Sequence, residues 1–137
     1  MQYTIDIKKG LGDIQFGMSV DQVVNIMGPA EDVETIDNAV DEMTTVLHYC
    51  DGLLTLFFEG DLPELSCIDT SVDTCTLFDQ PVFELEEKEI VQIMVEHNYC
   101  EEDADEEAWG ERRISFGEGN VDFFFDEGEL TSIVYGK

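Results

Sequence analysis

The side chains that could carry chemistry in this 137-residue sequence are two histidines, four cysteines and 33 carboxylates. Neither His48 nor His97 has a serine or cysteine nucleophile motif, such as G-x-S-x-G, beside it. General acid–base catalysis needs particular carboxylates held in reach of a substrate, and the abundance of acids singles out no pair. The sequence therefore predicts a protein that is not an enzyme and has no catalytic residues.

Metal and cofactor motifs are missing in the same way. The acidic segment 101–107 lacks the D-x-D-x-D-G pattern, with a glutamate at position twelve, that a calcium loop of the EF-hand type requires. The four cysteines contain no C-x-x-C pair, which favours reduced thiols over a zinc site or a disulfide framework. We therefore expect no metal and no cofactor, and we expect residues 101–107 to form a solvated loop.

Charge and composition limit the classes of partner. The formal net charge is −27, yet 43% of the residues are hydrophobic, so the chain has enough apolar side chains to fold. Six basic residues provide no footprint for nucleic acid or for an anionic membrane surface. The N-terminal residues resemble no secretion signal and no apolar run is long enough to span a membrane, so we expect a cytoplasmic protein.

An internal duplication organises the elements that must position these side chains. Residues 16–27 match residues 83–94, and residues 47–59 match residues 114–126, both at a spacing of 67 residues. The match predicts a single compact domain (1–137) made of two repeats, about 8–71 and 75–137, after an N-terminal strand at about 2–7. Residues 1–74 contain two basic and 15 acidic residues, and residues 75–137 contain four basic and 18 acidic residues. The acidity therefore belongs to both repeats.

Each repeat begins with a pattern typical of a helix. Ser19 and Gln22 form an S-x-x-Q capping box, and apolar residues at helical spacing follow as far as Gly28. In the second repeat a corresponding apolar stripe with Ile90 and Met94 follows an acidic first turn. These stripes indicate helices that pack on a core.

Each repeat then contains a hairpin. Asp51-Gly52 and Glu118-Gly119 lie between β-like runs and predict two-residue turns. Directly opposed residues share a face, so we expect ten side chains to face the helices: Leu47, Tyr49, Leu54, Leu56, Phe58, Ile114, Phe116, Val121, Phe123 and Phe125. Third strands are expected at 65–70 and 130–135, and a further strand near 33–36.

The opposite face of the hairpins is the predicted binding surface. It carries His48, Thr55 and Phe57 in the first repeat and Arg113, Ser115, Asp122 and Phe124 in the second. Two large aromatic side chains among polar neighbours are typical of anchors in a protein interface. We therefore expect the partner-binding residues to be those of this face and of the two turns: His48, Asp51, Phe57, Arg113, Glu118, Asp122 and Phe124.

Residues 12–29 carry a resemblance to a known family. They read Gly12-x-Ile14-x-Phe16-Gly17-Met18-Ser19-x-x-Gln22-Val23-x-x-Ile26-Met27-Gly28-Pro29, followed by a strand ending at Tyr49. This pattern resembles the repeats of β-lactamase-inhibitor-protein-like folds and of the related small outer-membrane-assembly lipoproteins. The resemblance implies an α+β tandem repeat, each unit a helical element packed on an antiparallel sheet of about four strands, with a concave face that grips a partner protein. It also implies a contact role for the acidic turn residue Asp51.

The charge and the repeat together predict a non-enzymatic protein-binding module. A strongly negative surface attracts cationic partners and accelerates their association. We expect a cytoplasmic inhibitor or immunity protein that neutralises a basic partner such as a toxin or nuclease, by electrostatic capture followed by docking of Phe57 and Phe124. The alternative is a ligand- or cation-binding sensor module that uses the same concave face. The sequence does not indicate an oligomeric state.

Overall fold

The chain folds into two sheets and two helices in a computed structural model that describes residues 2–38, 42–60, 62–100, 103–106 and 110–137. The larger sheet has eight strands in the order β10-β11-β12-β13-β7-β6-β5-β4. Their bounds are β4 Asp32–Asn38, β5 Glu42–Tyr49, β6 Leu54–Glu59, β7 Glu64–Thr70, β10 Asp103–Glu106, β11 Glu111–Phe116, β12 Val121–Asp126 and β13 Glu129–Gly136. The strands expected near 33–36, 65–70 and 130–135 are thereby confirmed as β4, β7 and β13.

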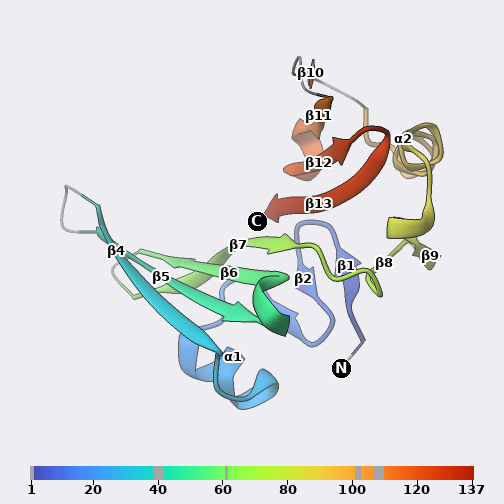
Figure 1. Cartoon of the computed structure of the whole chain (residues 1–137). Coiled ribbons are helices and arrows are strands. Elements are labelled where there is room, and N and C mark those ends of the chain that lie inside the picture. The colour runs from blue at the N-terminus through green and yellow to red at the C-terminus, as the bar shows by residue number, and fades with distance from the viewer. Residues whose placement is uncertain (1, 39–41, 61, 101–102, 107–109) are drawn as a thin grey trace.

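All neighbours in this sheet are antiparallel. Strands β4–β7 and β10–β13 are each joined to the next in chain order, and β7 pairs with β13 at the centre. Figure 1 shows the two halves meeting at an angle along β7 and β13, with both helices and the smaller sheet on the convex side.

The smaller sheet has the order β3-β2-β1-β8-β9 and is built from very short strands. Its bounds are β1 Thr4–Asp6, β2 Gly10–Leu11, β3 Ile14–Gln15, β8 Thr76–Leu77 and β9 Gln80–Pro81. Strand β1 lies within the N-terminal strand expected at 2–7 and pairs in parallel with β8. The Tyr135 hydroxyl on β13 donates to the Gly10 carbonyl at 2.9 Å and joins the two sheets.

The helices are α1 Val20–Met27 and α2 Glu87–Glu96. The predicted capping box is confirmed: Ser19 Oγ accepts from the Gln22 N–H and Gln22 Oε1 accepts from the Ser19 N–H. In α2, Glu86 is the N-cap and forms the equivalent pair with Glu89. A 3₁₀ turn, η2 Val82–Glu84, precedes α2.

One hydrophobic core lies on the convex side of the larger sheet. All ten side chains expected to face the helices are buried in it, at 5% exposure or less. Val23 of α1, Ile90 and Met94 of α2 and Leu11 of the smaller sheet belong to the same cluster. The period-two pattern of the hairpins therefore identified the inward-facing side chains correctly.

The predicted fold class is wrong. The protein is mostly β, with two sheets, and it does not consist of two helix-on-sheet units. The eight strands on which the units were to be built form one continuous sheet, and helices of eight and ten residues cover only part of it. The smaller sheet covers another part, and its two-residue strands are too short to leave an alternating pattern in the sequence.

Two local predictions also need correction. The hairpin pairs Tyr49–Leu54 and Phe116–Val121 are confirmed, but four residues connect each pair, in the 3₁₀ turns η1 Cys50–Gly52 and η3 Gly117–Gly119. Within the expected loop 101–107, the described residues form strand β10, and the others lie outside the described residues. Its acidic residues have no apolar alternation, so only pairing with β11 reveals a strand.

Candidate functional site

The concave side of the larger sheet, the outer face, carries five of the seven predicted binding residues: His48, Phe57, Arg113, Asp122 and Phe124. A single row of directly paired residues crosses it from β11 to β4, in the order Ser115, Asp122, Val134, Asp69, Thr55, His48 and Asp32. Successive members lie on neighbouring strands, so their side chains share one face. This central row contains one predicted site residue from each half, His48 and Asp122, which lie four strands apart on the same face.

Phe57 lies on one side of the central row. It pairs with Val46 on β5 and Cys67 on β7, and its side chain is half-buried. Val46 is only 2% exposed yet lies outside the core cluster, because it is on the outer face. Phe57 and Val46 therefore form a small apolar patch beside the central row.

Phe124 lies on the other side of the central row, in the second half of the sheet. It pairs with Arg113 on β11 and Ser132 on β13. The three residues, with Glu111 and Thr131, line a hollow of about 520 Å³. The Phe124 side chain is half-buried at the wall of this hollow, next to the strand that carries Arg113.

The middle of the outer face is negative and partly dehydrated. Burial raises the pKa of the Asp69 carboxyl above its ordinary value. Burial also raises the pKa of the Cys67 thiol to about 11, and the charges of Asp69, Glu59 and Asp122 add to that increase. A cationic group placed here would meet carboxylates that water solvates incompletely.

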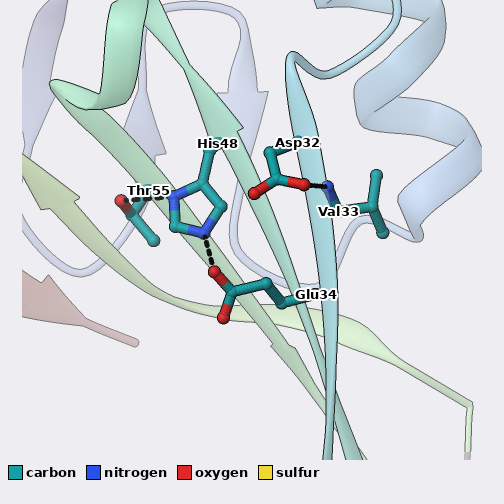
Figure 2. Close-up of polar contacts among 5 residues, drawn as sticks. All are labelled: Asp32, Val33, Glu34, His48 and Thr55. Carbon is teal, nitrogen blue, oxygen red and sulfur yellow. Dashed lines mark hydrogen bonds and ion pairs between the residues drawn. The ribbon is translucent and has the colours of Figure 1, made fainter.

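His48 is the centre of a polar cluster at the β4 edge of the row (Figure 2). Its Nδ1 lies 3.3 Å from Thr55 Oγ1 and its Nε2 lies 3.1 Å from Glu34 Oε1. Asp32 is directly opposite His48 in the register, and the Val33 N–H donates to its carboxylate at 3.0 Å. Asp32, Glu34 and His48 each offer one ligand atom, and these atoms lie within 4.8 Å of one another.

Sequence reasoning missed Asp32 and Glu34. A strand near 33–36 was expected, but its pairing was not, and only the β4–β5 register places these carboxylates beside the histidine. A hollow of about 390 Å³ is lined by the cluster together with Glu31 and Asp51. The signal available in the sequence was a D-x-E alternation, which is common in a chain this acidic.

The two acidic turn residues are separated by the structure. Asp51 is exposed in η1, where its N–H donates to Glu31 Oε1 at 2.6 Å. Glu118 is exposed in η3. Because η1 precedes Leu54 and η3 precedes Val121, whose strands run in opposite directions, the two loops lie at opposite ends of the sheet. Asp51 and Glu118 therefore do not form a single acidic site for a compact partner.

Comparison of the chain with protein-family models, with curated proteins and with solved structures gave no match. Neither helix of the described chain has the length and apolar character of a membrane-spanning segment.

Proposed function

We propose that the protein is a non-enzymatic binding module whose outer face docks a basic protein. In this proposal it works in the cytoplasm as an inhibitor or immunity protein that neutralises a cationic toxin or nuclease. A role of this kind is what the resemblance of residues 12–29 to β-lactamase-inhibitor-protein-like repeats implied, although the helix-on-sheet units that it also implied are not found in the fold.

One observation carries the proposal: the helices and the smaller sheet lie on the convex side (Figure 1), which leaves the concave face open. That face holds two half-buried aromatic side chains, Phe57 and Phe124, and three acids of the central row. Aromatic anchors in a polar surround are typical of the residues that dominate binding energy at protein interfaces. The net charge of −27 favours a partner of the opposite sign and speeds the encounter.

The mechanism follows from the arrangement. Long-range attraction first orients a cationic surface toward the sheet. Asp69 and Asp122 of the central row then pair with lysine or arginine side chains, and the burial of Asp69 strengthens its pair. Phe57 and Phe124 insert into the partner on either side of that row.

Site-specific photocrosslinking in a lysate of the source cells tests this function. Benzoylphenylalanine at position 124 retains an aromatic side chain on the outer face, and the same residue at the 53%-exposed position Val95 of α2 is the control. We expect position 124 to capture a protein of high isoelectric point, and we expect added salt to reduce the yield. Equal capture from both positions, or capture of acidic proteins only, would contradict the proposal.

A further inference from the structure

We propose that His48, Glu34 and Asp32 bind a divalent transition-metal ion, with zinc as the representative ion. Among the described residues this is the only group of three or more histidine, cysteine and acidic side chains whose ligand atoms converge. It is distinguished from the many surface acids by an imidazole, which transition metals prefer and calcium and magnesium do not. The inference does not depend on the proposed protein partner.

The strand geometry explains the convergence. His48 is directly opposite Asp32, and Glu34 is two residues further along β4, so all three side chains leave the same face of two paired strands (Figure 2). Tetrahedral zinc with bonds of about 2.05 Å holds its ligand atoms about 3.3 Å apart. The 3.1 Å between His48 Nε2 and Glu34 Oε1 is already close to that separation. Only the Asp32 carboxylate must approach, from within 4.8 Å.

Thr55, on a third strand, contacts the histidine ring and not the ion. Its Oγ1 lies 3.3 Å from His48 Nδ1, on the far side of the ring from Glu34. Metal-binding histidines usually donate their second ring N–H to such a partner, which fixes the ring and the tautomer. A metal on Nε2 requires the neutral Nδ1–H tautomer, so a proton carried on Nε2 in the metal-free protein moves through solvent to Nδ1 and the Nδ1–H then donates to Thr55 Oγ1. The hydroxyl can donate or accept, so it satisfies both tautomers.

Access and coordination number are consistent with an ion that exchanges with solvent. The side chains of His48 and Glu34 are 24% and 55% exposed, at the wall of the 390 Å³ hollow. Three protein ligands leave at least one tetrahedral position for water. The nearby carboxylates of Glu31 and Asp51, which line the same hollow, add negative potential that favours a cation.

Zinc titration of the reduced, metal-free protein by calorimetry tests the site, with millimolar magnesium present to occupy nonspecific acidic positions. We expect one zinc ion per chain. The variant H48Q should weaken its binding at least tenfold, and the matched control H97Q, which alters the only other histidine, should not. T55V should weaken binding about tenfold and T55S should restore it, since only the hydroxyl is needed.

Cysteine thiols are the competing ligands, so cobalt replaces zinc in a parallel absorption titration. We expect no thiolate-to-cobalt charge-transfer band, because no cysteine belongs to the converging group among the described residues. Such a band, equal affinities of H48Q and H97Q, or the lack of saturable binding at one ion per chain would overturn the inference. Circular dichroism of metal-free H48Q separates lost ligation from misfolding: a native spectrum with unchanged zinc affinity would also overturn it.

Discussion

Phe57 and Phe124 project from the same face of one sheet, yet they lie on opposite sides of the central row and three strands apart. Phe57 pairs with Cys67, which in turn pairs with Gly136 on β13. Phe124 pairs with Ser132, four residues earlier on β13 and on the other side of the row. Three inter-strand steps of about 4.8 Å and four residues of about 3.3 Å each place their Cα atoms about 20 Å apart along the sheet. The two side chains are therefore separate features of the outer face, and a partner that contacted both would have to span the central row.

The separation predicts additive stability effects for F57A and F124A. Residues more than about 10 Å apart without shared partners give additive changes in the free energy of unfolding, within about 0.5 kcal/mol. We expect F57A alone to cost about 1–2 kcal/mol, because Val46 loses part of the cover that keeps it 2% exposed. Urea unfolding of the two single variants and the double variant measures the coupling. A coupling energy above about 1 kcal/mol would show that the two side chains share a structural unit.

Asp69→Asn should stabilise the protein at neutral pH by about 1 kcal/mol, because it removes a half-buried charge that makes no hydrogen bond to the described residues. Burial raises the pKa of the Asp69 carboxyl in the folded state, whereas the ordinary value is 3.8. Below that value both states are protonated. As the pH rises from 3.8 through the folded-state pKa, the Asp69 carboxyl ionises more readily in the unfolded chain than in the folded protein. The folded protein therefore loses stability over this range.

The difference between D69N and the natural protein should therefore vanish as the pH falls below 3.8 and be complete at neutral pH. Chemical unfolding curves across this pH range measure it. The matched control is D122N, which removes another carboxylate of the central row, on the other half of the sheet. A stabilising effect of D69N that increased as the pH fell would contradict the raised pKa of the Asp69 carboxyl.

Cys67 should resist alkylation far longer than Cys100. Its pKa of about 11 leaves about one thiol in a thousand ionised at pH 8, and only the thiolate reacts. Cys100 is exposed and Cys75 is buried, with a pKa that burial raises, so we expect the reaction order Cys100, Cys67, Cys75 with iodoacetamide. Peptide mass spectrometry of samples quenched over time gives the separate rates.

The charge of Asp69 contributes to the raised Cys67 pKa, after burial itself. D69N should therefore accelerate alkylation of Cys67 at constant pH and leave the Cys100 rate unchanged. An equal acceleration of Cys67 and Cys100 alkylation would indicate partial unfolding. An unchanged Cys67 rate would show that the charge of Asp69 does not raise the Cys67 pKa.

The parts of the fold that were predictable from sequence are those governed by local periodicity. Alternation placed Leu56 and Phe123 inward because opposed residues in a hairpin share a face, and the capping box at Ser19 marked the start of α1. The pairing of β4 with β5 was not predictable, because polar residues such as Asp32 and Glu34 give no register signal. The proposed metal site depends on that register, so the sequence alone could not reveal it.

Tyr135→Phe should loosen the contact between the two sheets. Its hydroxyl donates to the Gly10 carbonyl at 2.9 Å in a buried site, so removal leaves that oxygen without its donor, at a cost of about 1–3 kcal/mol. Tyr49→Phe is the matched control, because Tyr49 makes a bond of the same length to the Gly28 carbonyl in a part-buried site where water can replace it. We expect Y49F to cost less than Y135F. Hydrogen exchange provides the local signature: amides of β1 and β2, such as that of Leu11, should lose protection in Y135F and keep it in Y49F. Equal stability and unchanged exchange in Y135F would show that the smaller sheet is held by its apolar contacts alone.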